Sequence, residues 1–223
     1  MFGEQKEIKV LHVDDEPDFL ALTKAFLERE YANLNIASAT SAEEGLELLK
    51  GGKYDVVVSD YKMPVMDGLE FLKTLRAGGN TIPFIMFTGK GREEVAIEAL
   101  NRGANHYLQK GVNITSMYGT LMHAIKQEVE TKRAGDELVE IRKEQQIVLE
   151  SVPAMIFHVD SDSNYIYANR RFADTFGLKP ADFKGKSTKA IFPEEAETYI
   201  KSDKEVVKSG VPKIRIINRL VAN

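Results

Sequence analysis

The chain has 223 residues, a formal net charge of -4 and no cysteine. Its 43% hydrophobic content is ordinary for a globular protein, and its length has room for two modest domains. The acidic balance argues against nucleic acid or an anionic membrane as a partner, and the lack of cysteine excludes disulfides and thiolate metal sites. There is no signal-peptide core and no apolar run of about 18 residues, so we expect a cytoplasmic protein.

Apolar runs in the first half of the sequence end at polar side chains of the types that react or bind ligands. The clearest run lies in DVVVSDYKMPVMDG at residues 55–68, where three valines and a serine precede Asp60. Unbroken apolar runs favour strands covered on both faces, as in parallel sheets, whose ligands bind beyond the carboxyl ends of the strands. Four such ends are predicted, with Asp14 and Asp15 after residues 8–13, Asp60 after 55–59, Thr88 within 82–89 and Lys110 within 105–111.

Segments of helical period alternate with these runs. Pro17 suits a first helical turn, Ser41 and Glu44 form a capping-box pattern, and glycines stand where helices should stop. Five consecutive strand–helix units predict a parallel α/β sheet with right-handed crossovers. The predicted helical segments are 17–30, 41–52, 68–79, 92–104 and 114–129. Helix stops are predicted at Gly51, Gly78 and Gly103. The buried face of the first helix is predicted to carry Phe19, Leu20, Leu22, Thr23, Phe26 and Leu27.

The acidic strand ends, together with Thr88 and Lys110, resemble the site of a response-regulator receiver domain of two-component signalling. We assign residues 1–128 to this domain. The resemblance implies a flavodoxin-like α/β fold with strand order 2-1-3-4-5, and a phosphorelay function in which a histidine kinase or phosphotransfer protein donates the phosphoryl group. It also implies the site residues: Asp60 as phosphoacceptor, Asp14 and Asp15 as the acidic pair that helps to hold a divalent cation, the Lys62 carbonyl as a further metal ligand, Thr88 as switch hydroxyl, Tyr107 as switch aromatic, and Lys110 as the active-site lysine.

Elementary electrostatics agrees with this assignment. Carboxylates 4 Å apart repel by roughly 4 kcal/mol per pair at an effective dielectric of about 20, so a cation is expected among the three. Mg²⁺ or Mn²⁺ suits such oxygen ligands. Asp60 would attack phosphorus and form an acyl phosphate, Thr88 would donate to the phosphoryl group, and Tyr107 would turn inward, changing the surface of the fourth helix, fifth strand and fifth helix.

Three residues depart from the family pattern. Gly111 stands where a proline commonly follows the lysine, which leaves a cis peptide there without support. Lys62 and Lys90 each lie two residues beyond an active-site position. We hypothesise that these lysines hinder the approach of hydrolytic water and lengthen the lifetime of the acyl phosphate. The alternative is two solvated surface lysines.

Residues 129–150 are highly charged and lack proline, and they predict a helical linker continuous with the last receiver helix. The linker offers a surface for a homodimer, although Gly135 and polar seam residues weaken its heptad pattern. A solvated single helix is the alternative. The apolar positions at roughly helical spacing are Leu138, Ile141, Val148 and Leu149.

Residues 151–223 resemble a partial PAS sensor domain. Two short strands around a DSDSN turn, Asn169 opening a helix, a long helix at 194–209 and a third strand at 213–221 carry the resemblance. The last two strands of the family's sheet have no counterpart, so we expect a fragment of a longer protein or a sheet completed by exchange with a partner. The chain has no cysteine for a flavin adduct and the long helix has no histidine for haem, so neither cofactor is expected, and the core is predicted from Phe157, Tyr165, Tyr167, Phe172, Phe176 and Phe183.

Other function classes stay open at this point. A phosphatase-like hydrolase would place a second aspartate where Lys62 stands, and no helix-turn-helix of a DNA-binding regulator follows the receiver. We expect no ATP-using kinase, but a phosphoacceptor regulator whose only activities are its own phosphorylation and dephosphorylation. The alternatives are the input portion of a longer hybrid kinase or PAS-containing protein, and a binding module that never accepts phosphate. His123 faintly resembles a phosphotransfer histidine, with a plain surface histidine as the favoured interpretation, while His12, His106 and His158 are too scattered for a metal site.

Overall fold

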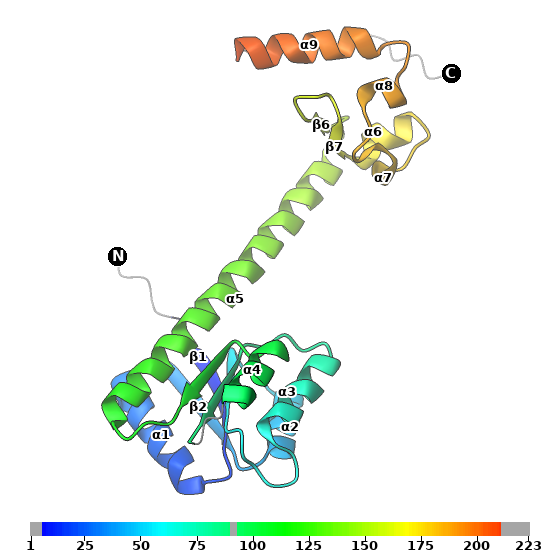
Figure 1. Ribbon diagram of the computed structural model, residues 1–223. Coiled ribbons are helices and arrows are strands. Elements are labelled where there is room, and N and C mark those ends of the chain that lie inside the picture. The colour runs from blue at the N-terminus through cyan, green and yellow to red at the C-terminus, as the bar shows by residue number, and fades with distance from the viewer. Residues whose placement is uncertain (1–5, 90–92, 211–223) are drawn as a thin grey trace. The chain divides into compact units, whose positions relative to one another are not determined.

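The structure is a computed structural model that describes residues 6–89 and 93–210. It divides into two compact units, residues 1–137 and 138–223, and each is described by itself (Figure 1). No helix within the described residues is long and apolar enough to cross a bilayer.

The first unit is built on one parallel sheet of five strands in the order β2-β1-β3-β4-β5. The four runs predicted to be strands form β1, β3, β4 and β5, β2 had no predicted range, and the predicted strand order is confirmed. The strands are β1 (Ile8–Val13), β2 (Leu34–Ala39), β3 (Val56–Ser59), β4 (Phe84–Thr88) and β5 (His106–Gln109).

The register of the central strands brings two acidic strand ends together. Val13 pairs with Ala39 on one side and with Ser59 on the other. The backbone N–H of Asp60 donates to the Val13 carbonyl at 2.8 Å, and that of Asp14 donates to the Ala39 carbonyl at 3.0 Å. Both aspartates therefore leave the sheet at its carboxyl edge, where ligands of open parallel sheets bind.

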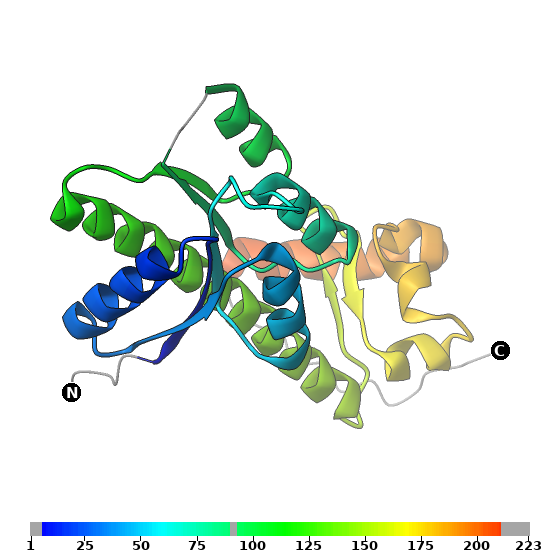
Figure 2. The same ribbon diagram turned by 90° about the horizontal axis from the view of Figure 1, so that it is seen from below.

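Helices cover both faces of this sheet (Figures 1 and 2). Helix α1 and the first half of α5 pack on one face, whereas α2, α3 and α4 pack on the other, and each face has its own buried apolar cluster. Strands β3 and β4 are consequently buried at every position, without polar alternation. The helices are α1 (Pro17–Glu30), α2 (Ala42–Gly51), α3 (Gly68–Ala77), α4 (Glu93–Asn101) and α5 (Ile114–Ser151).

The predicted cap of α2 is present with one change. The Ser41 hydroxyl accepts from the N–H of Glu44 at 3.2 Å, as a capping box requires. The Glu44 carboxylate returns to the N–H of Thr40 at 2.6 Å, one residue earlier than the pattern predicts. The predicted glycine stops at Gly78 and Gly103 lie just beyond α3 and α4.

The predicted buried face of α1 is wrong at one residue. Leu20, Thr23 and Leu27 are buried, but Leu22 is 50% exposed. At about 100° per residue, Leu22 lies about 200° from Leu20, on the solvent side of the helix. The Thr23 hydroxyl lies 2.9 Å from the hydroxyl of the buried Tyr118 of α5, which ties the two helices of this face together.

Helix α5 continues past the first core, as predicted for the linker. Its last residue in the buried cluster is Val129. One turn later, Arg133 donates to the Glu7 carbonyl at 2.6 Å and pairs with the Asp55 carboxylate at 3.0 Å. The other Asp55 oxygen accepts from the N–H of Lys9 at 2.8 Å. Arg133 therefore fastens α5 to the amino ends of β1 and β3, at the edge opposite the acidic strand ends.

The described part of the second unit contains an antiparallel two-stranded sheet and short helices. The predicted turn joins the strands, and the Asp160 carboxylate accepts from the N–H groups of Asp162 and Asn164 at 2.9 and 2.8 Å. The third strand predicted at 213–221 lies outside the described residues. The elements are β6 (Phe157–Val159), β7 (Tyr165–Ala168), α6 (Arg170–Thr175), α7 (Pro180–Phe183), α8 (Thr188–Ile191) and α9 (Ala196–Ser209), which is the predicted long helix.

Aromatic rings form the core of the second unit. Tyr165, Phe172 and Phe183 are buried, with ring centroids between 5.1 and 6.0 Å apart. The prediction that Phe157 is buried is wrong. In the described sheet β6 pairs only with β7, and the Phe157 ring is 48% exposed, although it packs 4.8 Å from Phe172. Half-buried residues against this cluster are Val159, Phe176, Leu178, Ile191 and Phe192.

Asn169 opens α6, as predicted, and also joins it to the end of α5. Its side-chain NH₂ donates to the carbonyls of Leu149 and Ala154 at 3.1 and 2.8 Å. Its side-chain oxygen accepts from the N–H groups of Ile156 and Phe172, both at 3.0 Å. This fully buried amide thus has four hydrogen bonds, the number that one amide can make.

Glu150 makes a second connection at the same junction. Its two carboxylate oxygens accept from the Tyr167 hydroxyl and from the backbone N–H of Arg170, both at 2.8 Å. Tyr167, predicted to be a core residue, is half-buried and directs its hydroxyl to this carboxylate. The last turn of α5 is therefore part of the folded second unit.

Candidate functional site

Asp14, Asp60 and Lys110 meet at the carboxyl edge of the sheet. The Lys110 ammonium nitrogen lies 2.6 Å from Asp14 Oδ2 and 2.8 Å from Asp60 Oδ1. Both aspartates are buried, and Lys110 is half-buried. The ammonium group therefore offsets the repulsion between two carboxylates held close together away from water. The sequence pattern named all three residues, and the strand register brings them into contact.

Lys110 is positioned by both its backbone and its side chain. Its N–H donates to the Thr88 carbonyl at 2.8 Å, and its ammonium group lies 4.3 Å from the ring centroid of Phe19 in α1. Burial by itself lowers the pKa of Lys110, but hydrogen bonds and charge interactions with Asp14 and Asp60 outweigh burial and leave the pKa raised. Lys110 is therefore a cation at neutral pH.

The Asp60 carboxylate is held at both oxygens. Oδ1 faces the Lys110 ammonium group, and Oδ2 accepts from the backbone N–H of Lys62 at 2.5 Å. Burial raises the pKa of Asp60, even though Lys110 and the Lys62 N–H act in the opposite direction. The arrangement presents a fixed, poorly solvated carboxylate beside a cation.

The chain after Asp60 runs tightly against the start of α3. The Gly68 N–H donates to the Tyr61 carbonyl at 2.9 Å. A Cβ atom at Gly68 would overlap the Asp60 carbonyl oxygen and lie 2.9 Å from the Met86 sulfur, so this position requires glycine. Asp67 caps α3 by accepting from two N–H groups of its first turn, both at 2.9 Å. These contacts fix the loop that carries Asp60.

Thr88 and Tyr107 lie on the strands predicted for them. Thr88 is buried at the end of β4, next to the backbone of Lys110. Tyr107 is half-buried on β5, where it pairs with Met86 and packs against the cluster on the α2–α4 face. Lys90 lies outside the described residues.

The acidic edge supplies oxygen ligands for a hard cation but no complete cage of side chains. Asp15 is exposed, and within residues 6–89 and 93–210 no three His, Asp or Glu side chains gather closely enough to hold a metal ion. Mg²⁺ commonly keeps several waters and uses only one or two carboxylates. The buried pair of Asp14 and Asp60, with the main chain of Lys62 adjacent, fits such a water-rich ion.

His12 is a buried polar residue beside this site. It is 1% exposed, and its ring nitrogens have no hydrogen-bond partner within the described residues. Burial, with a smaller contribution from Lys110, lowers the pKa of His12 to about 3, so the ring is neutral. Its ring packs edge-on to Phe19 at 6.0 Å. The other receiver histidines are His106, 2.9 Å from Glu128, and His123, exposed on α5 as predicted.

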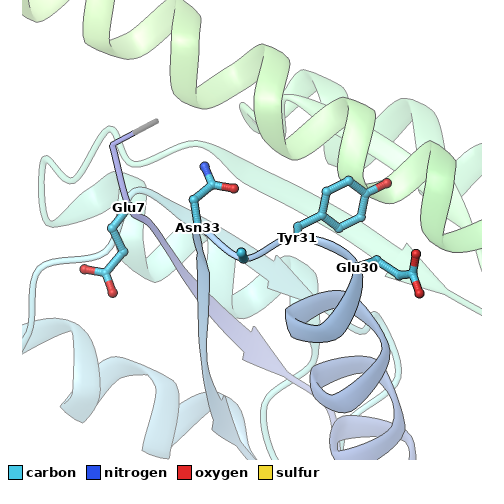
Figure 3. A pocket seen from close by; sticks show the side chains of 5 residues that line it. Glu7, Glu30, Tyr31 and Asn33 are labelled. Atoms are coloured by element: carbon cyan, nitrogen blue, oxygen red, sulfur yellow. The ribbon is translucent and has the colours of Figure 1, made fainter. Parts of the chain in front are cut away.

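A surface hollow at the opposite edge of the sheet does not share these features (Figure 3). It is lined by Glu7, Glu30, Tyr31, Ala32 and Asn33, which flank the amino ends of β1 and β2. The Glu7 and Glu30 side chains stand apart in Figure 3, and each has its own exposed partner, Lys9 at 3.6 Å from Glu7 and Arg29 at 3.0 Å from Glu30, unlike the shared contact of Lys110. The chemistry of the unit is therefore concentrated at the Asp60 edge.

Two contributions to the site were not predicted from the sequence. Phe19 was assigned to the helix core, but its ring also faces the Lys110 ammonium group. Gly68 is required by close packing against Asp60. The Asp67–Gly68 pair was an available signal, because a capping residue followed by glycine often opens a helix after a tight turn.

Comparison with known families agrees with this geometry. The sequence model of the response regulator receiver domain matches residues 10–122, half of the chain, including Asp14, Asp60 and Lys110. The chain belongs to the response regulator receiver family. A second family model, described as a PAS fold, matches residues 149–219. The receiver domain is therefore followed by a PAS fold, as predicted.

Curated relatives of this receiver domain include transcriptional regulators. The transcriptional regulatory protein ZraR of Salmonella typhimurium is 32% identical over 149 residues, which are 67% of this chain and 33% of that protein. ZraR of Escherichia coli is 33% identical over 118 residues, which are 53% of this chain and 26% of that protein. The chain thus spans about a third or less of the length of these curated relatives.

Solved receiver structures share the fold of the first unit. A response regulator receiver domain protein from Clostridium thermocellum is 31% identical, with a TM-score of 0.51, and the match covers 57% of this chain and 98% of that one. A CheY-like receiver domain protein from Methanospirillum hungatei is 29% identical, with a TM-score of 0.52, and covers 58% of this chain and 99% of its own. The receiver fold is therefore shown by sequence and by structure.

Proposed function

We propose that this receiver domain accepts a phosphoryl group on Asp60 and acts as a phosphorelay regulator coupled to its PAS fold. The observation that carries the proposal is the contact of one ammonium group, on Lys110, with both Asp14 and Asp60 at the carboxyl edge of the sheet. A buried carboxylate beside a fixed cation is suited to receive a group that brings more negative charge.

The proposed reaction is a phosphoryl transfer from a histidine kinase or phosphotransfer protein. An Asp60 carboxylate oxygen forms a bond to phosphorus while the bond from phosphorus to the donor histidine nitrogen breaks, and the imidazole leaves. Lys110 stabilises the charge on the phosphoryl oxygens by position and electrostatics. The product is an acyl phosphate on Asp60, and only this self-modification and its reversal are proposed as activities.

A divalent cation is part of the proposal. Asp14, Asp15, Asp60 and the backbone carbonyl of Lys62 would hold Mg²⁺ or Mn²⁺, with water completing the shell. When bound, the ion would supply positive charge for the phosphoryl oxygens. The buried pair of Asp14 and Asp60 supports this assignment, and exposed Asp15 would join through water.

The proposed switch begins at Thr88. Phosphorylation adds about 1.5 to 2 negative charges and three strong acceptor oxygens. The Thr88 hydroxyl, at the end of the strand next to Asp60, would donate to one of them, and Tyr107 would then turn inward. The half-buried position of Tyr107 on β5 is compatible with such a movement.

The acyl-phosphate lifetime is proposed to depend on Lys62. Its side chain is exposed while its N–H holds Asp60, so the side chain is free to cover the phosphoryl group or to remain in solvent. A Lys62→Asn variant should hydrolyse its acyl phosphate faster. An unchanged rate would show that this lysine is a plain surface residue, and Lys90 would be tested in the same way.

The wider assignment is proposed on the same basis. A receiver coupled to a PAS fold fits a cytoplasmic location and a histidine kinase or phosphotransfer protein as partner. It also fits self-association through the linker helix or the second unit. Residues 1–128, 129–150 and 151–223 are the proposed receiver, linker and partial PAS domains. The alternatives are the input portion of a longer signalling protein and a binding module that never accepts phosphate.

The deciding experiment is the intact mass of the chain after incubation with acetyl phosphate and Mg²⁺. We expect a gain of one phosphoryl group, about 80 Da. The gain should vanish in Asp60→Asn and with EDTA, and should persist in Asp55→Asn, which changes an aspartate at the other end of the same strand. No gain in the parent protein would favour the binding module, and a gain in Asp60→Asn would place the acceptor elsewhere.

A further inference from the structure

An exposed apolar stripe runs along α5 between the segments that the two family models match. Leu138, Ile141 and Val148 are 57%, 42% and 60% exposed, although they are large and apolar. Together with exposed Gln145, they follow the three-and-four residue spacing of heptad a and d positions. Earlier in the same helix, exposed Thr131 and Ala134 continue the spacing with smaller side chains.

We propose that this stripe pairs with the same stripe of a second copy of the chain, as a parallel, in-register, two-stranded coiled coil. The inference deepens, and rests on, the self-association included in the proposed function. It names the surface and the orientation of the two helices. The stripe spans about two and a half heptads, shorter than a long coiled coil, so a reversible dimer is expected.

The charges beside the stripe favour a second copy in the parallel orientation. Glu137 precedes the a position of Leu138, and Arg142 follows the d position of Ile141. In a parallel pair, Glu137 of one helix faces Arg142 of the other. Within the described residues, neither side chain has an ion-pair partner in its own chain. Both are therefore available to a partner.

The antiparallel orientation places like charges together. In that arrangement Arg142 would face Arg142 of the copy, and Glu144 would face Glu144. Surface ion pairs add little stability, about 0 to 1 kcal/mol each, so their effect here is on orientation more than on affinity. The apolar residues supply the attraction, and the charges select the direction.

Gln145 fixes the register. It is the polar residue at an a position between Ile141 and Val148. A buried polar residue at one a position favours the register in which it meets its own copy, because the two amides can then hydrogen-bond to each other. A shift by one heptad would place Gln145 opposite Leu138 and leave its amide without a partner.

The test uses the full chain and matched substitutions on one helix. The molar mass would be measured by sedimentation over a concentration series for the parent, for Ile141→Glu and Val148→Glu, and for Val139→Glu and Ile147→Glu. Val139 and Ile147 are 51% and 64% exposed on the same helix but lie off the stripe. The stripe variants should weaken the dimer by about tenfold or more, and the control variants should leave it unchanged.

Orientation would be tested with single cysteines, since the chain has none of its own. A Gln145→Cys variant should form an intermolecular disulfide under mild oxidation, whereas Lys143→Cys, on the outer side of the helix, should not. Arg142→Glu should weaken the dimer, and the double variant Glu137→Arg with Arg142→Glu should restore it.

A parent chain that stays monomeric, with or without acetyl phosphate and Mg²⁺, would overturn the proposal. So would a dimer that survives both stripe variants, or one that the control variants disrupt equally. Phosphoryl uptake on Asp60, read from intact mass, is measured separately on every variant. A parent chain that takes up a phosphoryl group but does not dimerise would contradict only this inference. A parent chain that dimerises but takes up no phosphoryl group would contradict only the proposed phosphoacceptor function.

Discussion

The two units of the chain bury their cores differently. In the receiver domain, helices cover a five-stranded sheet on both faces, and each face has its own apolar cluster. In the described part of the second unit, a two-stranded sheet shares one cluster built largely from aromatic rings. A two-stranded sheet is not stable by itself and depends on such packing. Stability is thus spread over two faces in the receiver and concentrated in one cluster in the second unit.

The units also differ in what they do with a buried polar side chain. Asp60 of the receiver is a carboxylate whose pKa is raised by burial, so its charged form is disfavoured in the fold. Asn169 of the second unit is equally buried, but its four hydrogen bonds satisfy it completely. The contrast shows that burial opposes the charged form of Asp60, whereas the fully hydrogen-bonded amide of Asn169 holds neighbouring segments together.

The largest expected effect comes from removing one ring in each core. Phe71→Ala and Phe172→Ala should each cost about 4 kcal/mol in free energy of unfolding, because each leaves a cavity among buried residues. Phe71→Ala should lower only the receiver transition, and Phe172→Ala only that of the second unit. Calorimetry with limited proteolysis would assign the transitions. A single transition shifted equally by both variants would contradict separate cores.

Glycine substitutions compare close packing with backbone conformation. Gly68→Ala should cost about 3 kcal/mol, because its Cβ overlaps the Asp60 carbonyl oxygen and a strand or helix must move. Gly185→Ala should cost about 1 kcal/mol, because its φ of +77° strains any other residue but no atom lies within 4 Å of the new Cβ. Denaturant unfolding of both variants would measure the difference, and equal costs would rule out the steric explanation.

The amide of Asn169 can be compared with that of Asn105 in the receiver. Asn169→Ala should cost about 2 kcal/mol, because it removes all four hydrogen bonds of a buried amide, including the one from the N–H of buried Phe172. Asn105→Ala should cost about 1 kcal/mol, because Asn105 is exposed and makes two side-chain hydrogen bonds, from the Phe84 N–H at 2.9 Å and to the Glu128 carboxylate at 2.6 Å. Urea unfolding would rank them, and the reverse order would show that the junction with α5 contributes little.

The smallest effect has the opposite sign. Asp60→Asn should raise the free energy of unfolding of the receiver by about 1 kcal/mol, because it removes a buried charge while Asp14 still pairs with Lys110. Thermal unfolding in EDTA would measure the gain without a bound cation. Asp55→Asn is the control and should be destabilising, since its carboxylate is paired with Arg133. A loss of stability in Asp60→Asn would mean that the carboxylate supports the fold.

Much of the receiver could be predicted because its signals are local. Short runs predicted four of the five strands and the polar residues that end them, Asp60, Thr88 and Lys110, whereas β2 was implied only by the count of five strand–helix units. Their contact distances could not be predicted, because the meeting of Lys110 with Asp14 and Asp60 depends on the register of separate strands.

The errors have physical causes that lie beyond local pattern. Leu22 is apolar, but at about 100° per residue it lies about 200° from Leu20, on the solvent side of α1. Phe157 sits in an apolar strand whose neighbour on one side is absent from the described sheet. The Glu44 carboxylate reaches Thr40 instead of the N-cap residue, a shift of one position that the capping pattern does not specify.

Strand β3 has an acidic residue at each end, and this gives the receiver a built-in reporter position. Asp60 follows its last residue, and Asp55 precedes its first and accepts from Arg133 and from the N–H of Lys9. Asp55 and Asp60 are five residues apart, so at about 3.3 Å per residue they lie at opposite ends of the strand. Any displacement of β3 along its axis would change this hydrogen bond, so hydrogen exchange at the Lys9 amide would report such a movement from the end of the strand opposite Asp60.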